Sequence, residues 1–352
     1  MKNNFIFGKG NQEINKLAKL KKFALPAINV SGTNTINSVL ETASELNSPV
    51  IIQFSNGGSQ FIAGKGMPSK DFNTSIAGSI AGAYHIHKTI DYYNSKVIIH
   101  TDHCSRKLLP WIDGLLEYGK GFYNKNGYPL FSSHMIDLSE EPIEENIATC
   151  KEYLKKMTDL DMTLEIELGV TGGEEDGVDN SDIDSSKLYT QPEEVAYAYS
   201  ELKSVSDKFM IAAAFGNVHG VYKPGNVVLT PKILDNSQKF IEEKFGTEKQ
   251  PINFVFHGGS GSSQAEITEA IGYGVIKMNI DTDLQWGFTE GVRDYFLAKN
   301  DYVKTQIGNP EGEEKPNKKY YDPRKYLREA ELTFKTRLTR SFNDLNNINT
   351  NA

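Results

Sequence analysis

Three features of the sequence predict an α/β fold, specifically a (β/α)8 or TIM barrel of parallel strands. Eight short runs of apolar residues are each long enough to form a strand. Most of these runs are followed by a segment in which apolar residues recur at the period of a helix. The chain has 352 residues and 30 glycines, which suits one large barrel with many tight turns between strands and helices.

The predicted strands are the strongest of these features. Several of them are continuously apolar, which is typical of parallel strands that are covered on both faces. In chain order, the predicted strands are residues 24–30, 49–55, 96–103, 130–137, 162–168, 209–216, 252–259 and 275–281.

Helices are predicted between the strands. In residues 35–46, apolar side chains recur every three or four positions, and residues 143–157 and 191–202 show the same period. Alternating strands and helices of this kind favour a parallel sheet.

Two polar residues are predicted to mark helix starts. Ser139 is followed closely by Pro142, and Thr190 has Glu193 three residues further on. An open, doubly wound sheet is the alternative fold, but no G-x-G-x-x-G motif follows the first predicted strand.

Two long insertions interrupt the pattern. Residues 169–188 are polar and rich in glycine, and we expect a mobile loop after the fifth strand. Residues 306–324 are rich in Pro, Lys and Asn, and we expect a functional loop there, with a solvated linker as the alternative. Residues 325–345 have a helical period and are predicted to pack on the outside of the barrel or on a partner. We expect one domain over residues 1–352, with 306–352 as a C-terminal loop and helical extension.

The overall composition excludes several classes of protein. A net charge of −8 argues against a nucleic-acid-binding protein, which is usually basic. Two cysteines do not make a disulfide framework, so we expect a reducing, cytoplasmic location. We expect no signal peptide and no membrane association, because no stretch approaches the ~20 apolar residues of a membrane span.

Polar side chains gather where the predicted strands end. In a barrel of this kind, the chemistry lies at the carboxyl ends of the strands. Read in chain order, the residues at these ends are Asn29, Ser55, Asp102 with His103, Asp137, Glu167, Asn217 with His219, His257, and Asn279 with Asp281. A purely structural barrel has no need for so many ligand or proton-transfer groups at one end.

Three of these residues predict a metal site. His103, His219 and His257 follow the third, sixth and seventh strands, and three neutral imidazoles with one open position form a catalytic Zn2+ site. Any one of them alone would be read as a structural histidine. The other histidines do not share this placement and are interpreted as ordinary core or surface residues; they are His85, His87, His100 and His134.

A glycine-rich turn predicts a phosphate site. Residues 257–263 read His-Gly-Gly-Ser-Gly-Ser-Ser, and a helix follows, so backbone N–H groups and the helix dipole favour an anion. The loops after strands seven and eight are the usual phosphate site of such barrels, and residues 275–282 supply the second loop.

Six motifs together resemble class II fructose-bisphosphate aldolase. They are His-Thr-Asp-His-Cys at 100–104, Leu-Glu-Ile-Glu-Leu-Gly at 164–169, Thr-Gly-Gly-Glu-Glu-Asp-Gly at 171–177, Gly-Asn-Val-His-Gly-Val-Tyr at 216–222, His-Gly-Gly-Ser-Gly at 257–261 and Asn-Ile-Asp-Thr-Asp at 279–283. The resemblance runs from about residue 24 to residue 328. The segment 316–324 is similar to the longer subgroup, the homodimeric bacterial and fungal type.

The resemblance implies a reaction and its metal chemistry. The reaction is reversible cleavage of fructose 1,6-bisphosphate, a phosphosugar of glycolysis and gluconeogenesis, to dihydroxyacetone phosphate and glyceraldehyde 3-phosphate. The three strand-end histidines would hold the catalytic zinc, and Asp137 with Glu167 would form a second divalent metal position. Asp102 would move the proton of the C4 hydroxyl. Glu175, with Glu174 as its alternative, would act on the C1/C3 proton.

The resemblance also implies how substrate is held. The phosphate of the dihydroxyacetone phosphate half would be bound by Gly220, Gly258, Ser260, Asp281 and Thr282. Ser55 and Arg324 would hold the other phosphate, and Asn29 and Asn279 the sugar oxygens. A monovalent cation, Na+ or K+, would lie near the first phosphate, and the protein would be a homodimer.

Three alternatives stay open at the level of sequence. Tagatose-bisphosphate aldolase uses the same chemistry, although its members tend to lack the long insertions. A Schiff-base aldolase would use Lys277, whose strand parity allows it to point inward, but a lysine paired with a carboxylate is the simpler interpretation. A non-catalytic phosphosugar-binding or adhesion role is the third.

Overall fold

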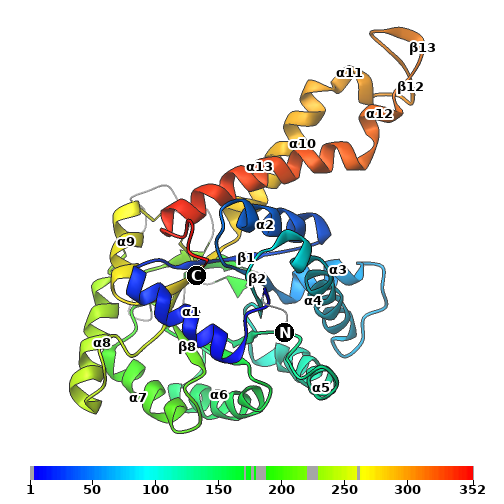
Figure 1. Ribbon diagram of the computed structural model, residues 1–352. Helices are drawn as coiled ribbons and strands as arrows, with labels where there is room; N and C mark the ends of the chain where they lie inside the picture. Colours follow the sequence, from blue (N-terminus) through cyan, green and yellow to red (C-terminus); the bar gives the residue numbers. More distant parts are fainter. Residues whose placement is uncertain are drawn as a thin grey trace.

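A computed structural model of the chain describes residues 4–169, 172–175, 178–179, 188–219, 229–259 and 262–351. At 172–175, 178–179 and 218–219 it describes the backbone alone. Figure 1 shows a barrel wrapped by helices, from which an arm of helices projects.

The eight predicted strands are present and run parallel. They are β1 (Leu25–Asn29), β2 (Val50–Phe54), β3 (Val97–Thr101), β4 (Ser133–Ile136), β5 (Thr163–Leu168), β8 (Phe209–Ala213), β10 (Phe254–Phe256) and β11 (Val275–Ile280). Their order in the sheet is β3-β2-β1-β11-β10-β8-β5-β4. The predicted barrel is confirmed.

Ser132 joins β3 and β4, the strands at the two ends of this order. Its backbone N–H donates to the carbonyl of Ile99 at 2.8 Å, and its side-chain Oγ accepts from the Ile99 N–H at 2.9 Å. The edges of the sheet therefore meet, which rules out the open, doubly wound alternative.

Helices cover the outside of the barrel. They are α2 (Thr33–Glu45), α3 (Asn56–Ala63), α4 (Asn73–Tyr93), α5 (Leu109–Asn126) after a 3-10 turn (Arg106–Leu108), α6 (Ile143–Thr158), α7 (Pro192–Lys203), α8 (Lys232–Phe245) and α9 (Gln264–Gly272). The three helices predicted from periodicity correspond to α2, α6 and α7.

Both predicted helix starts are wrong, by three residues at Ser139 and by one residue at Thr190. The Ser139 hydroxyl donates to Asp137 at 2.7 Å, and α6 begins only after Pro142. The Thr190 hydroxyl donates to the Leu168 carbonyl at 2.6 Å, and Gln191 precedes α7, with its N–H bound to Glu194. Each hydroxyl therefore donates to a residue at the end of a strand and does not cap a helix.

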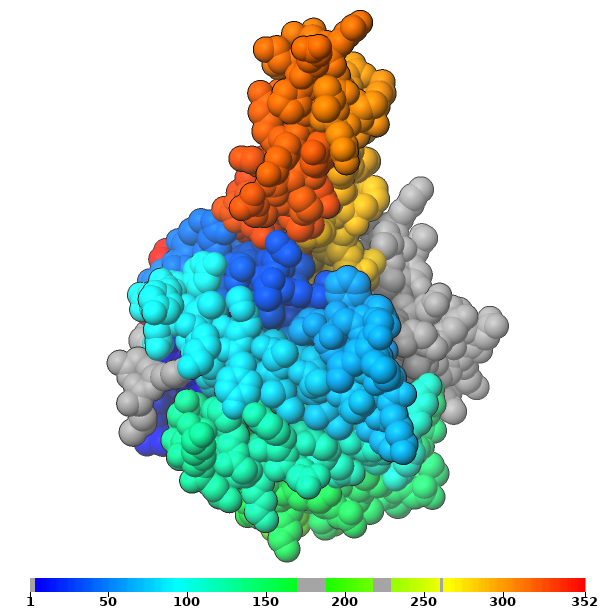
Figure 2. Space-filling view, turned by 90° about the vertical axis from the view of Figure 1, so that its right-hand side faces the viewer, coloured from blue at the N-terminus to red at the C-terminus, as the bar shows by residue number. Residues whose placement is uncertain are grey.

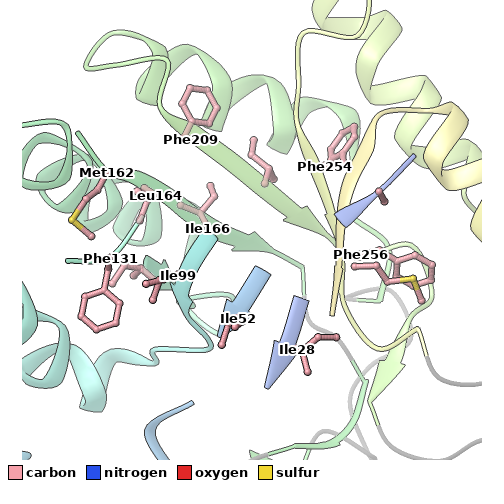
Figure 3. Close-up of a cluster of buried hydrophobic side chains, with 14 of the residues drawn as sticks. Ile28, Ile52, Ile99, Phe131, Met162, Leu164, Ile166, Phe209, Phe254 and Phe256 are labelled. Atoms are coloured by element: carbon pink, nitrogen blue, oxygen red, sulfur yellow. The ribbon is translucent and has the colours of Figure 1, made fainter. Parts of the chain in front are cut away.

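The main hydrophobic core lies between the strands and the outer helices. Figure 3 shows part of it, with Ile28, Ile52 and Ile99 from neighbouring strands beside Phe131 and Ile166. These residues occupy the apolar positions that identified the strands in the sequence.

A second core fills the barrel and is closed by α1 (Gly8–Lys21), which was not among the predicted helices. Ile14 and Ala18 of α1 pack against Leu25, Ile98 and other inward-facing strand residues. The segment before α1 bonds to the start of β3, with the Val97 N–H donating to the Asn4 carbonyl at 2.8 Å. Since α1 packs at the amino-terminal end of the strands, the carboxyl ends are the end available for a site.

The segment 306–324 has regular structure, so the expectation that it is an irregular loop is wrong. It forms the hairpin β12 (Ile307–Asn309) and β13 (Gly312–Pro316), then α12 (Lys318–Tyr321). Asn317 holds the turn together, donating to the carbonyls of Thr305 and Gly308 at 2.8 and 2.9 Å. Ladder hydrogen bonds and the buried amide of Asn317 hold this segment together. It therefore lacks the apolar periodicity from which secondary structure is predicted.

The same segment lies at the outer end of the arm. The arm consists of α10 (Thr282–Ala298), α11 (Asn300–Val303), the hairpin, α12 and α13 (Pro323–Asp344) (Figures 1 and 2). The predicted C-terminal helix is therefore confirmed as α13. Its Lys335 contacts Glu41 and Glu45 of α2 at 2.6 and 2.7 Å, which fixes the arm to the barrel.

The predicted loop at 169–188 lies largely outside the described residues. Its described backbone forms β6 (Gly172–Glu175) and β7 (Val178–Asp179), which pair with β9 (Val218–His219) in the order β7-β6-β9. Among the described helices, none is long and apolar enough to cross a membrane.

Close packing of α10 on α13 predicts a specific weak point in the arm. A Cβ at Gly291 would lie 2.6 Å from the Ala330 Cα and 2.7 Å from the Glu329 carbonyl oxygen. We expect Gly291→Ala to lower the free energy of unfolding by about 1–3 kcal/mol, because backbone atoms cannot yield as a flexible side chain can. Thermal or urea unfolding measures this.

Gly121 of α5 is the matched control, since a Cβ there meets nothing within 4 Å. Gly121→Ala should leave stability unchanged or raise it by up to about 1 kcal/mol, as expected for an open helical position. Equal effects at the two glycines would contradict the packing argument.

Candidate active site

Polar side chains from six strands meet at the carboxyl end of the barrel. The residues that lie there are Asn29 at the end of β1, Asp102 and His103 just after β3, Asp137 after β4, Glu167 in β5, His257 after β10, and Asn279 and Asp281 at the end of β11. Hydrogen bonds and short contacts connect them to one another. The convergence follows from closing parallel strands, because all of their carboxyl ends face the same way.

Asp102 is held from two sides by amide groups. The Asn29 Nδ2 donates to its Oδ2 at 3.0 Å, and the Asn279 Nδ2 donates to its Oδ1 at 3.1 Å. Asp102 is only 1% exposed, and burial alone would raise its pKa. The charges of His103 and Lys277 outweigh burial and hold the pKa of Asp102 at about 2. This carboxylate is therefore ionised and ready to accept a proton at neutral pH.

The two described imidazoles of the site, His103 and His257, lie with ring centroids 4.7 Å apart. Each has one nitrogen against a carboxylate. The His103 Nδ1 lies 3.0 Å from Asp137, and the His257 Nε2 lies 2.8 Å from Glu165. The Nδ1 atoms of the two rings also lie 3.5 and 3.3 Å from the same oxygen of Glu167. A carboxylate on one ring nitrogen fixes which nitrogen is left to act as a ligand.

The charges around these rings shift pKa values in opposite directions. Burial would raise the pKa of Asp137, but its contact with His103 and its bonds from Ser139 lower it below the usual range. Burial would lower the pKa of His257, but Glu167 and Glu165 raise it to about 9. The site is therefore a cluster of carboxylates that favours a positive charge between them.

Among the side chains that the structure describes, two sets have the geometry to hold a metal ion. Asp102, His103 and His257 form one, and His103, Asp137 and Glu167 form the other, with ligand atoms within 4.8 Å of one another in each set. Imidazole and carboxylate donors suit Zn2+, with carboxylate-rich sets accepting other divalent ions as well. The residues present therefore fit a catalytic zinc ion, and His103 is common to both sets.

Beneath this cluster, Lys277 is paired with Glu165. Both side chains are fully buried inside the barrel, and the Lys277 Nζ contacts the two oxygens of Glu165 at 2.9 and 2.7 Å. The expectation that Lys277 is paired with a carboxylate is confirmed. A lysine held in this way is not placed as a nucleophile toward a carbonyl.

The comparisons with known proteins agree with one another. The family model described as fructose-bisphosphate aldolase class-II matches residues 10–350. The fructose-bisphosphate aldolase of Campylobacter jejuni subsp. jejuni serotype O:2 is 60% identical over 343 residues, which is 96% of each chain. The fructose-bisphosphate aldolase class 2 of Escherichia coli K12 is 57% identical over 344 residues, covering 97% of this chain and 96% of that one.

A solved structure extends the likeness to three dimensions. The crystal structure of fructose-bisphosphate aldolase from Campylobacter jejuni matches with a TM-score of 0.90 and 57% identity, over 99% of this chain and 97% of that one. The chain belongs to the class II fructose-bisphosphate aldolase family. It is therefore an aldolase, a carbon–carbon lyase.

Several residues predicted for this aldolase fall outside the described side chains. Gly220 and Ser260 lie outside the described residues. The backbones of Glu174 and Glu175 are in β6 and that of His219 is in β9, and Gly173 of β6 pairs with His219 in register. The β6–β9 pairing therefore brings the backbone near Glu174 and Glu175 alongside the third predicted zinc ligand.

The predicted phosphate residues of the aldolase lie at turns after strands. Gly258 follows His257 with φ +61°, a conformation that favours glycine. Thr282 begins α10, and Asp281 accepts hydrogen bonds from Asn29 and Gln285 at 3.4 and 2.9 Å. A carboxylate repels phosphate, so Asp281 can bind one only through its backbone N–H, whereas Thr282 can use both its backbone N–H and its hydroxyl at the start of α10.

Two residues predicted to bind the other phosphate have local partners in the aldolase. The Ser55 Oγ accepts from the Gly58 N–H at 3.1 Å and so caps α3. Arg324 lies in the first turn of α13, directly after α12 at the outer end of the arm, and contacts Asp322 at 2.6 Å (Figure 1). Within one chain, Arg324 is not brought to the strand ends.

Sequence reasoning missed two buried polar residues of the site. Gln53 donates to the Oδ1 of Asn29, which turns the Asn29 amide N–H groups toward Asp102, and Glu165 contacts His257. Gln53 interrupts an otherwise apolar strand, and Glu165 is a charged residue inside a fully buried strand, and these are the signals that could have found them. Of the remaining histidines, His85, His87 and His134 are held by Asn37, the Leu130 carbonyl and Thr101, as ordinary core or surface residues are. His100 bonds to Ser133 and also contacts Glu165 at 3.1 Å.

Proposed function

We propose that the chain reversibly cleaves fructose 1,6-bisphosphate to dihydroxyacetone phosphate and glyceraldehyde 3-phosphate, with a catalytic zinc ion at His103, His219 and His257. The observation that carries this proposal is the ionised Asp102, which accepts hydrogen bonds from two side-chain amides and lies beside the two imidazoles of the site. When bound, the zinc ion would act as a Lewis acid that stabilises the negative charge left by breaking the C3–C4 bond.

The acid–base steps are assigned to carboxylates. Asp102 takes the proton of the C4 hydroxyl as the carbon–carbon bond breaks, because its pKa of about 2 keeps it ionised. Asn29 and Asn279 hold Asp102 in place and present their amides to the sugar oxygens. Glu175, with Glu174 as the alternative, moves the proton at C1/C3.

Binding residues are assigned to the two phosphates. Gly220, Gly258, Ser260, Asp281 and Thr282 bind the phosphate of the dihydroxyacetone phosphate half, with Na+ or K+ beside it, and Ser55 and Arg324 bind the other. Holding both ends of the substrate orients the reacting carbons between them. Asp137 and Glu167, together with His103, form a second divalent metal position, supported by the closeness of their ligand atoms.

We also propose a homodimer in the cytoplasm. The cytoplasmic location is supported by Cys104 and Cys150, which are both buried and free. The homodimer is supported by Arg324, which lies on the arm and is 87% exposed. If Arg324 binds a substrate phosphate, it does so in the site of a second copy.

A chelator assay tests the reaction class. Cleavage should stop when the metal is removed and return when zinc is restored, with about one catalytic ion per chain, and His219→Ala should lose both metal and activity. Fructose and tagatose bisphosphates should be compared side by side. Full activity of the metal-free protein, or trapping of substrate on Lys277 by borohydride, would show that the proposal is wrong.

Variants that lack one of the two acid–base carboxylates should be impaired in different steps of the reaction. Asp102→Ala should slow C–C cleavage by ~100-fold or more, as expected for loss of a positioned proton carrier. It should affect the exchange of the dihydroxyacetone phosphate proton with solvent less, since that step does not involve the C4 hydroxyl. Glu175→Ala should slow exchange as well as cleavage. Isotope exchange measured beside cleavage distinguishes them, and the opposite pattern would reverse the two roles.

Hybrid dimers test which site Arg324 serves. Arg324→Ala should raise KM for the bisphosphate by ~10-fold or more, because a charge-assisted contact is lost. A hybrid of one Asp102→Ala chain and one Arg324→Ala chain, isolated with two different tags, should regain low-KM activity at about half the wild-type level. One site then combines an intact Asp102 with the arm of the other chain. A hybrid without low-KM activity would place Arg324 in its own chain's site.

A further inference from the structure

Three charged or ionisable side chains form a chain of contacts through the middle of the barrel. Lys277 of β11 contacts both oxygens of Glu165 of β5, at 2.9 and 2.7 Å. The same carboxylate accepts from the Nε2 of His257, after β10, at 2.8 Å. All three side chains are at most 1% exposed. The contacts run from the closed interior of the barrel to the proposed metal site.

The contact with Glu165 decides which ring nitrogen of His257 is directed at the site. Because Nε2 donates to Glu165, its hydrogen lies on that nitrogen, and the lone pair of the neutral ring is on Nδ1. Nδ1 is the nitrogen that lies 3.3 Å from Glu167, a member of the second metal-ligand set. The same carboxylate contact also fixes the rotation of the ring.

We infer that Glu165 and Lys277 are positioning residues that set the tautomer and orientation of His257 for metal binding. This inference rests on the proposed role of His257 as a zinc ligand. Glu165 supplies the acceptor for Nε2–H, and Lys277 holds Glu165 so that one oxygen stays directed at His257.

Lys277 has a definite task in this arrangement because Glu165 has a competing partner. The Nε2 of His100 lies 3.1 Å from the second oxygen of Glu165. Without Lys277, the carboxylate would be free to turn toward His100 and release His257. The two-point contact from Lys277 prevents that rotation by engaging both oxygens at once.

A purely structural ion pair makes a different prediction. Buried ion pairs can often be replaced by apolar residues of similar size without loss of stability. If Glu165 and Lys277 only fill the barrel, any uncharged replacement that packs well should leave the metal site unchanged. If they position His257, a replacement must keep an acceptor at residue 165.

Two double variants separate these roles. Glu165→Gln with Lys277→Met removes both charges but keeps an oxygen that can accept from Nε2–H. The amide N–H group of the glutamine can donate to the Nε2 of His100, so this contact replaces Lys277 in preventing rotation. Glu165→Leu with Lys277→Met removes both charges and the acceptor. The readouts are zinc affinity by competition with a chelator, the visible spectrum of the cobalt-substituted protein, and the melting temperature.

We expect the Gln/Met variant to bind zinc within about threefold of wild type, and the Leu/Met variant to bind it ~10–100-fold more weakly, with an altered cobalt spectrum, as for other residues that orient metal ligands. Equal zinc affinities and spectra in the two variants would overturn the inference. A wild-type chain that binds no zinc, or a His257→Ala variant that keeps full affinity, would instead overturn the proposed function.

A measurement on the wild-type protein covers the case in which the Leu/Met variant does not fold. Nitrogen NMR of the zinc-loaded protein, with isotopically labelled histidine, reports which ring nitrogen carries hydrogen. For His257 we expect hydrogen on Nε2 and metal on Nδ1. The reverse assignment would contradict the positioning role of Glu165.

Discussion

The whole architecture depends on the closure of the sheet at Ser132. This residue lies before β4, and it bonds to Ile99 of β3 through both its backbone and its side chain. Its hydroxyl also donates to the Ile6 carbonyl at 2.6 Å, which ties the segment before α1 to the same seam. Ser132 therefore contributes to closing the barrel and also anchors the segment that leads to α1. Because closure forces the carboxyl ends of the strands together, it creates the rim on which Asp102, His103 and His257 meet.

Charge balance is the second constraint on this rim. Four carboxylates lie at or just below the rim, with few positive charges among them; they belong to Asp102, Asp137, Glu165 and Glu167. Lys277 is the one lysine buried with them in the described chain, and the remaining negative charge faces His103 and His257. Carboxylates that are crowded in this way are costly unless a positive charge lies between them. A divalent cation at the proposed metal site would meet that requirement, so the crowding of these carboxylates supports the proposed site.

Most of the barrel and the rim could be predicted from the sequence, because apolar strand runs end in polar residues at a regular spacing. Asn29, Asp102, His257 and Asn279 were found in this way. The helix α1 and the β12–β13 hairpin were not predicted, since α1 has only a short apolar stripe and the hairpin is held by Asn317 and ladder hydrogen bonds rather than by an apolar face. Gln53 and Glu165 were missed because the role of a polar residue inside a buried strand depends on its partner. That partner comes from another strand and cannot be identified from the sequence.

The arm is where the sequence prediction and the fold of a single chain diverge most. Its helix α10 starts at Thr282, immediately after the strand-end residues Asn279 and Asp281, and then leads away from the barrel (Figure 1). Along the arm, Trp286 and Leu297 of α10 and Ile307 of β12 are 48%, 71% and 62% exposed. Apolar side chains on a projecting element are typical of a surface that contacts another chain. The proposed phosphate ligand Arg324 lies on this same arm, so under the proposed function the contact that covers these side chains also completes a site. Assembly and catalysis would then depend on one structural element, and a change that separates α10 from α13 would weaken both.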